Sequence, residues 1–326
     1  MYSAKIIGLG KFLPKDKITN SDLEKMVDTS DEWITTRTGI KERRILKERK
    51  GASFLAYQAS IPALKMAGLS PKDIELIIVA TITPDMPFPS TACFLQKHLN
   101  AKNAVAFDIS AACSGFVYAL ITAYQFISSG LYKNALVVGS EVLSTVVDWK
   151  DRATCVLFGD GAGAVVLTRS KEKTLLGSYM ASDGSFAHLL MIPAGGSVNP
   201  TSIYTVNNRL HYIKMVGNEL FKIAVRMMVK AAEESIKSAN IRPKDIDLFI
   251  PHQANERIIN AVLERLSLPK EKAYINIHRY GNMSSASVII ALVEAYEENR
   301  IKKGDILLLD TFGAGLVCGS CVIKWV

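Results

Sequence analysis

The sequence has 326 residues, 49% of them hydrophobic and 21% charged, a balance that permits a large buried core and excludes a disordered chain. The net charge of +8 favours an acidic or phosphorylated partner, but the basic residues are dispersed, so we expect no nucleic-acid binding. Residues 1–16 hold only a short apolar run, and no stretch of about eighteen apolar residues occurs. We therefore expect a cytoplasmic protein with no signal peptide and no membrane association.

The five cysteines, at positions 93, 113, 155, 318 and 321, are odd in number and scattered along the chain. A disulfide framework is therefore not expected. Cys318 and Cys321 form one CxxC pair, but neither a second pair nor a nearby histidine completes a metal site. We expect both to be buried structural residues, and we expect no metal.

The expected elements alternate between strands and helices along the chain. Strands are predicted at 74–81, 104–110, 135–141 and 248–252, and helices at 91–99, 114–130, 220–239 and 257–266. Residues 154–168 are predicted as two strands joined by a hairpin turn at Asp160-Gly161, because FGDGAG lacks the spacing of a phosphate-binding loop. The alternation predicts an α/β fold with parallel sheets covered by helices on both faces.

The chain also contains a weak internal repeat. PKDIEL at 71–76 returns as PKDIDL at 243–248, and AFDIS at 106–110 resembles AYINI at 273–277. The matches keep the same order along the chain, which predicts two related halves, 1–172 and 173–326.

Three loops that follow predicted strands carry candidate catalytic side chains, and such loops hold the sites of open α/β sheets. Cys113 lies among small residues where a strand turns into a helix, a setting that favours the thiolate and offers amides to an oxyanion. A buried, inert cysteine is the alternative. His252 in PHQAN and Asn282 in YGNMSSAS have surface and helix-capping alternatives. Together the three side chains fit a nucleophile with two hydrogen-bonding assistants.

With these motifs in view, the chain resembles the thiolase-fold condensing enzymes, and within them the β-ketoacyl-acyl-carrier-protein synthase III family. The likeness runs from about Lys5 to the C-terminus. It is carried by TSDEWITTRTGIKERR (29–44), FPSTAC (88–93), DISAACSGF (108–116), FGDGAGA (158–164), GNELFK (217–222), PHQAN (251–255) and YGNMSSAS (280–287). The resemblance implies a duplicated, layered αβαβα fold. It also implies a decarboxylative condensation of an acyl-CoA starter, expected to be acetyl-CoA, with a malonyl-acyl carrier protein that initiates fatty-acid synthesis.

The resemblance also implies residue roles. Cys113 would be acylated, His252 and Asn282 would promote decarboxylation of the malonyl thioester, and the amides of Cys113 and Ala314 would form the oxyanion hole. Acyl-CoA would be a substrate rather than a cofactor. The remaining positions are implied to bind CoA (Trp33, Arg37, Arg152, Gly217 and Asn255), to dock the carrier protein (Lys222 and Arg257) and to reach across a homodimer into the partner's acyl pocket (Phe88).

One departure from the family pattern is Ala314, where three successive glycines are usual. If Ala314 needs a positive φ, strain of about 1 kcal/mol follows, and its methyl group could narrow the acyl site. The starter is thus left open. Four alternatives compete with this reading: a thiolase, for which Cys318 is poorly placed; a condensing enzyme of secondary metabolism; a papain-like thiol hydrolase; and a non-enzymatic scaffold.

Overall fold

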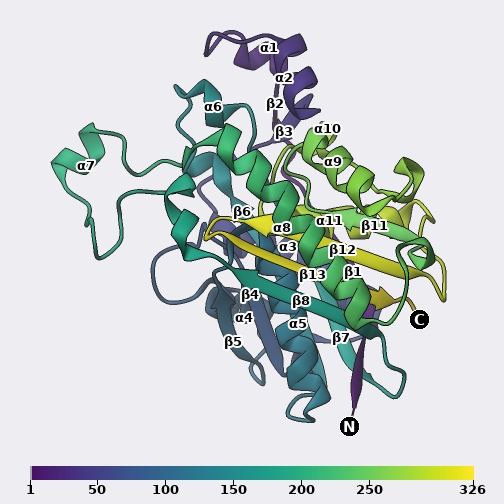
Figure 1. Cartoon of the computed structure of the whole chain (residues 1–326). Coiled ribbons are helices and arrows are strands. Elements are labelled where there is room, and N and C mark those ends of the chain that lie inside the picture. Colours follow the sequence, from purple (N-terminus) through teal and green to yellow (C-terminus); the bar gives the residue numbers. More distant parts are fainter. Residues whose placement is uncertain (1) are drawn as a thin grey trace.

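Two large sheets form the framework of the computed structural model, which describes residues 2–326 (Figure 1). The first sheet contains, in spatial order, β1 (Ser3–Phe12), β7 (Asp160–Ser170), β6 (Asn134–Val142), β4 (Leu76–Ala80) and β5 (Val105–Ile109). The second contains β11 (Leu248–Pro251), β12 (Ile306–Gly313), β13 (Val317–Lys324) and β8 (Leu175–Ser182). Two short ladders pair β2 (Lys17–Thr19) with β3 (Glu42–Arg44) and β9 (Leu190–Met191) with β10 (Lys214–Met215).

Both large sheets are mixed, so the prediction of parallel sheets is wrong in part. β4 runs parallel to β5 and β6, and β11 parallel to β12, whereas β7 and β13 run antiparallel to both of their neighbours. β7 and β13 follow their partner strands without a long crossover helix, and such connections produce antiparallel pairs. The order β1-β7-β6-β4 thus has the same strand directions as β8-β13-β12-β11. On this repeat we propose the two halves 1–172 and 173–326, divided between β7 and β8.

Helices cover the sheets in three layers. Their bounds are α1 (Asn20–Leu23), α2 (Asp31–Thr38), α3 (Gly51–Ala67), α4 (Thr91–Leu99), α5 (Gly115–Ser128), α6 (Arg152–Cys155), α7 (Ile203–Asn207), α8 (Gly217–Ser238), α9 (Glu256–Leu266), α10 (Ile277–Tyr280) and α11 (Ser285–Glu297). α5 and α11 share one core with both sheets, α3 and α4 pack on the outer face of the first sheet, and α8 and α9 pack on the second. The predicted αβαβα architecture is confirmed.

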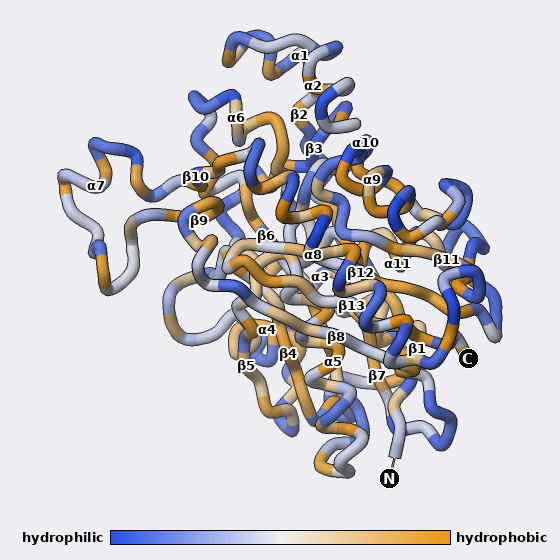
Figure 2. The backbone as a smooth tube through the Cα atoms, viewed as in Figure 1, coloured by the Kyte–Doolittle hydropathy of each residue, from blue (hydrophilic) through white to orange (hydrophobic). Residues whose placement is uncertain are grey.

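Strand β4 shows why the middle layers are apolar. Its five residues are all buried, with Leu76, Ile78 and Ala80 facing the central helices and Ile77 and Val79 facing α3 and α4. Each fully buried Leu or Ile contributes about 1.5–3 kcal/mol of hydrophobic free energy. Figure 2 shows the same pattern, with hydrophobic strands in the middle of the molecule and hydrophilic residues gathered at its periphery.

Residues 158–163 do not form the predicted hairpin. A short helix, α6, precedes them, and Asp160 begins the long strand β7. The glycines serve packing instead, because a Cβ at Gly161 would lie 2.7 Å from Met283 and one at Gly163 would lie 2.6 Å from Ile289. These two positions let α11 lie close against the sheet.

Residues 273–277, expected to match a strand of the first half, make one isolated bridge between Phe249 and Ala273 before α10 begins at Ile277. Cys318 and Cys321 are buried in β13 with free thiols, as predicted. Among residues 2–326, every helix is too short or too polar to cross a bilayer.

Candidate active site

Cys113, His252 and Asn282 line one cavity of about 680 Å³, although they are far apart in the chain. Cys113 follows β5, His252 follows β11, and Asn282 lies between α10 and α11. Phe312 and Gly313, at the end of β12, line the same cavity. The fold thus brings together the three side chains that the sequence singled out.

Cys113 lies in a tight turn that small residues make possible. Ala112–Ser114 form a single 3₁₀ turn directly before α5, and Ala112 has a φ of 44°. A Cβ at Gly313 would lie 2.6 Å from the Cys113 backbone nitrogen. Only glycine therefore lets the end of β12 approach the nucleophile this closely, and it leaves the Cys113 amide beside the cavity.

The Cys113 thiol is protonated in the free protein at neutral pH. Burial raises its pKa to about 12, the neighbouring Glu141 carboxylate also raises it, and the Ser284 hydroxyl acts in the opposite direction. The sequence-based expectation of a favoured thiolate is therefore wrong for the unliganded state, because loss of hydration outweighs the helix N-terminus. A group that takes the thiol proton is needed during catalysis.

His252 is 2% exposed, and burial lowers its pKa to about 3, so its imidazole is neutral at physiological pH. Its backbone N–H donates to the Asp310 carbonyl at 2.8 Å, while its Nδ1 has no partner among residues 2–326. A neutral imidazole with a free ring nitrogen can donate or accept one hydrogen bond with a substrate.

Asn282 is held by its backbone. Its N–H donates to Leu157 at 2.8 Å and its carbonyl accepts from Gly159 at 2.9 Å. Its side-chain Oδ1 accepts the Ser284 N–H at 2.8 Å, so the carboxamide Nδ2 is the end available to a ligand. Asn282 is therefore not the N-cap of α11, which is Ser284.

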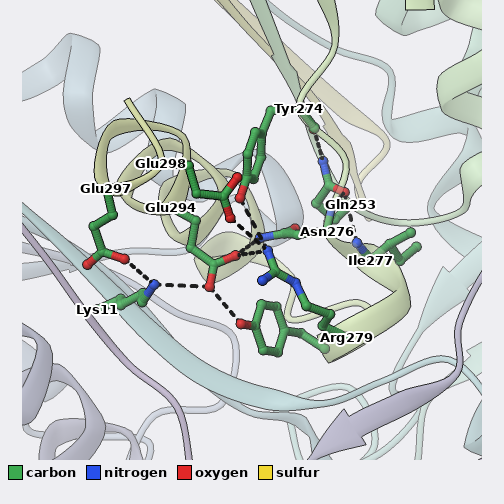
Figure 3. Close-up of polar contacts among 10 residues, drawn as sticks. Lys11, Gln253, Tyr274, Asn276, Ile277, Arg279, Glu294, Glu297 and Glu298 are labelled. Atoms are coloured by element: carbon green, nitrogen blue, oxygen red, sulfur yellow. Dashed lines mark hydrogen bonds and ion pairs between the residues drawn. The ribbon is translucent and has the colours of Figure 1, made fainter. Parts of the chain in front are cut away.

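Figure 3 shows a buried polar network around Gln253 and Glu294, beside the loops that carry His252 and Asn282. Gln253, next to His252, donates to the carbonyls of Pro251 and Tyr274 and accepts the backbone N–H groups of Asn276 and Ile277. All these bonds lie between 2.8 and 3.2 Å. Gln253 thus ties the β11 loop to the segment that leads through α10 to Asn282.

Glu294 of α11 also binds the segment 276–280, which leads to Asn282. Its carboxylate accepts from Asn276 at 2.9 Å and from Tyr280 at 2.6 Å, and it pairs with Lys11 and Arg279. Burial alone would raise the pKa of Glu294, but the hydrogen bonds from Tyr280, Asn276 and Lys11 hold it below its ordinary value. Glu294 could not be identified from the sequence, because an acidic residue in an apolar helix predicts an exposed position.

The mouth of the cavity is basic and aromatic. Trp33 and Arg37 of α2 line it, and the Arg152 guanidinium lies 4.6 Å from the centre of the Trp33 ring. Arg37 lies 5.6 Å from the same ring. A flat aromatic group that binds on Trp33 must therefore displace Arg152 and can then be covered by it.

Other predicted binding residues also line this cavity: Gly217, Lys222, Asn255 and Arg257. Gly217 begins α8, and Arg257 lies 5.4 Å above the Phe221 ring. Asn255 caps α9 by accepting from Arg257 N–H and donates from Nδ2 to the Arg37 carbonyl at 3.0 Å. Asn255 thereby fixes α2 against α9 at the entrance.

A second, apolar cavity of about 210 Å³ meets the first at Cys113. Its walls include Ile82, Leu143, Leu190, Ile192 and Ile213, together with Ser284 and Ala314. Positive φ occurs at Gly315, with 144°, and not at Ala314, so the strain considered for Ala314 does not arise. The thiol therefore lies where the larger cavity, which also carries basic side chains such as Arg37 and Arg257, meets the smaller apolar pocket.

Phe88 lies away from this cavity, in the loop between β4 and α4, and is 84% exposed. Residues 2–326 contain no cluster of three metal-ligating side chains.

Comparison with known proteins identifies the family. The model for 3-oxoacyl-[acyl-carrier-protein] synthase III matches residues 107–184, and the model for the C-terminal part of the same enzyme matches residues 236–325. The β-ketoacyl-[acyl-carrier-protein] synthase III of Caldanaerobacter subterraneus subsp. tengcongensis is 56% identical over 324 residues, which cover 99% of this chain and 98% of that protein.

Solved structures agree. The 3-oxoacyl-[acyl-carrier-protein] synthase III of Aquifex aeolicus is 53% identical with a TM-score of 0.92, covering 99% of this chain and 100% of that one. The priming β-ketosynthase of the R1128 polyketide pathway has the same TM-score at 33% identity, covering 99% and 96%. Fold and site thus define a condensing acyltransferase. Within that class, the chain belongs to the β-ketoacyl-acyl-carrier-protein synthase III family.

Proposed function

We propose that this enzyme transfers an acyl group, with acetyl as the starter, from acyl-CoA to Cys113 and then condenses it with a malonyl group on acyl carrier protein. The observation that carries the proposal is the position of the thiol at the junction of two cavities. A thioester carbonyl bound at Cys113 would leave its acyl chain in the apolar pocket and its pantetheine arm in the larger cavity. This reaction would initiate fatty-acid synthesis.

In the second half-reaction the malonyl thioester would occupy the larger cavity. His252, which is neutral, and the Asn282 carboxamide would donate hydrogen bonds to its carbonyl oxygen and stabilise the enolate left by loss of CO₂. The enolate carbon would attack the acyl-Cys113 carbonyl, whose oxygen the amides of Cys113 and Ala314 would hold. Collapse of that adduct releases the β-ketoacyl carrier protein.

The basic and aromatic residues at the mouth of the larger cavity would bind phosphorylated substrates. Trp33 and Arg152 would hold the CoA adenine between them, and Arg37, Gly217 and Asn255 would line its path. Lys222 and Arg257 are exposed at the rim and would attract the acidic carrier protein. CoA is a substrate in this scheme, and no cofactor is required.

We also propose a cytoplasmic homodimer in which Phe88 reaches the partner's acyl pocket. The support is the exposure of two large apolar side chains on one loop, Phe88 at 84% and Met86 at 45%, which a partner surface would cover. The cytoplasmic location stays a prediction from the sequence.

A condensing enzyme of secondary metabolism is the second candidate, because the similarity to the R1128 priming β-ketosynthase extends over 99% of the chain. The higher identity to synthase III enzymes favours the primary pathway. A panel of acyl-CoA starters, from acetyl to hexanoyl, assayed with malonyl carrier protein would separate the two candidates.

The deciding experiment mixes the enzyme with acetyl-CoA and measures its intact mass. An acetyl adduct is expected on the wild type and should be absent from Cys113→Ser. Adding malonyl carrier protein should then remove the adduct and yield acetoacetyl carrier protein. An unmodified wild-type mass, with CoA shown to bind, would contradict the proposal.

A further inference from the structure

A buried carboxylate behind the nucleophile has no role in the scheme above. Glu141, near the end of β6, is 0% exposed. It accepts hydrogen bonds from the Thr83 hydroxyl at 2.7 Å, the Ser285 hydroxyl at 2.9 Å and the Ile82 backbone N–H at 3.1 Å. These donors are neutral, and no salt bridge to Glu141 occurs among residues 2–326. A carboxylate kept in a core without a cationic partner is costly and calls for an explanation.

The acidic residues on neighbouring elements have hydrogen-bond or ion-pair partners other than Glu141. On β5, Asp108 accepts from the Thr91 and Ala92 amides, and on β7, Asp160 accepts from Leu46 and Ser144. Glu294 of α11 is engaged by Lys11 and Arg279. The titratable group whose pKa the Glu141 carboxylate raises is the Cys113 thiol.

Ser284 is close to both groups. It lines the apolar cavity together with Cys113, and its hydroxyl lowers the pKa of both the thiol and the Glu141 carboxylate. Among residues 2–326 this hydroxyl has no hydrogen bond of regular geometry, although the residue is only 1% exposed. Its backbone is also held at a φ of 46° and a ψ of −122°, a region that serine rarely adopts. A buried hydroxyl without a regular hydrogen bond therefore belongs to the same cavity wall as the reacting sulfur.

We propose that Ser284 and Glu141 form a proton relay that takes the thiol proton from Cys113 during acylation and returns it during condensation. The relay rests on the proposed function for its substrates. In this relay Ser284 would exchange the proton with the sulfur, and Glu141 would act through it. Burial raises the pKa of Glu141, which makes its carboxylate a stronger base than a surface one.

The proton balance closes over the two half-reactions. In acylation, the sulfur attacks the thioester carbonyl, the S–H proton passes to the Ser284 oxygen, and the Ser284 proton passes to Glu141. The adduct collapses to acyl-Cys113 and CoA thiolate, which takes a proton from water. In condensation, the enolate attacks acyl-Cys113, the Cys113 thiolate leaves, and protonated Glu141 returns its proton through Ser284.

The test compares Glu141→Gln and Ser284→Gly with the wild type, the glycine being chosen because it tolerates the positive φ. Rapid-quench mass spectrometry measures the rate of Cys113 acetylation by acetyl-CoA between pH 5.5 and 9.5. Both variants should be about a hundredfold slower at pH 7, the usual scale of general-base catalysis. Their rates should rise about tenfold per pH unit, because solvent must now remove the proton, whereas the wild type should reach a plateau.

A second readout needs no substrate. If Glu141 only repelled the thiolate, Glu141→Gln would lower the thiol pKa and speed alkylation of Cys113 by iodoacetamide; the relay predicts slower alkylation. Ser140→Ala is the matched control, because Ser140 is the next buried residue on β6 and its hydroxyl bonds Ala52 on the other face. Its acetylation rate should stay within about twofold of wild type.

The outcomes are distinct. Faster alkylation of Glu141→Gln, or variant and wild-type pH profiles that differ only by a constant factor, would overturn the relay. If Glu141→Gln does not fold, as judged by its thermal unfolding, Ser284→Gly decides alone. Failure of the wild type itself to become acetylated would instead contradict the proposed function.

Discussion

The His252 imidazole is useful to the reaction because it stays uncharged. It is buried, burial lowers its pKa to about 3, and it therefore remains neutral from pH 8 down to well below pH 5. A neutral imidazole carries a proton on one of its two nitrogens. That N–H can donate a hydrogen bond to a thioester oxygen. A neutral His252 thus supports the proposed role as a hydrogen-bond donor to the substrate carbonyl.

We predict that His252→Ala lowers condensation by about 10²–10³-fold, the usual effect of removing one oxyanion donor, while leaving acetylation of Cys113 within about threefold. NMR of histidine-labelled wild type, with His252→Ala used for assignment, should show no His252 titration between pH 5 and 8. A midpoint near 6.5, or condensation by His252→Ala at the wild-type rate, would contradict this role.

The candidate catalytic residues were predictable from the sequence, whereas the residues that position them were not. Cys113, His252 and Asn282 each stand in a loop after a predicted strand, so local sequence marks them. Gln253 and Glu294 form hydrogen bonds with residues on other segments, such as Asn276 and Lys11. Such long-range pairs cannot be recognised from one amino-acid sequence. The walls of the apolar pocket come from scattered residues with no period, which is why the starter stayed open.

Among the elements, α11 has the greatest effect on the site. It carries Ser284 at its N-cap, follows Asn282 directly, and packs against β6 and β7 at positions where only glycine fits. The glycines at 158–163 predict a turn when only their neighbours in the sequence are considered. In the structure they are required by the close approach of α11, which is more than a hundred residues away in the chain. Elements with a local signal, such as α4, α5 and β4, were predicted to within two residues at each end.

Replacing Gly139 tests this packing. A Cβ there would lie 2.6 Å from the Ser285 carbonyl oxygen and 2.9 Å from its carbon, both backbone atoms that cannot turn aside. We predict that Gly139→Ala lowers the free energy of unfolding by about 1–3 kcal/mol and displaces the start of α11, which slows condensation. Urea unfolding and the coupled assay measure the two effects.

Gly184→Ala is the matched control for that substitution, since a Cβ at this position would meet nothing within 4 Å and its φ is not positive. It should change the free energy of unfolding by less than about 0.5 kcal/mol. Equal stability of the two variants would show that α11 does not depend on close approach to β6.

At the scale of the whole molecule, several large apolar side chains are exposed far from the central cores. Phe88 is 84% exposed, and Ile203 and Tyr204 of α7 are 82% and 68% exposed, on a segment that projects from the body in Figure 1. Isolated exposed apolar residues are ordinary, but burying a largely exposed phenylalanine in a partner surface would gain hydrophobic free energy. The chain therefore presents surface that a second copy can bury.

We predict that the wild type sediments at about 71 kDa, twice the chain mass of 35.7 kDa, and that Phe88→Asp shifts the population toward the monomer. A carboxylate placed in a contact would be buried without a partner, which costs several kcal/mol and weakens association many-fold.

Leu131→Asp is the control, because Leu131 is also exposed, at 62%, but lies before β6, at the opposite end of the sheet from Phe88. Since dimers are sensitive to concentration, sedimentation velocity should be run from about 1 to 50 µM protein. A wild type that is monomeric over that range, or a Phe88→Asp variant that remains dimeric, would remove Phe88 from the interface while leaving the chemistry at Cys113 unaffected.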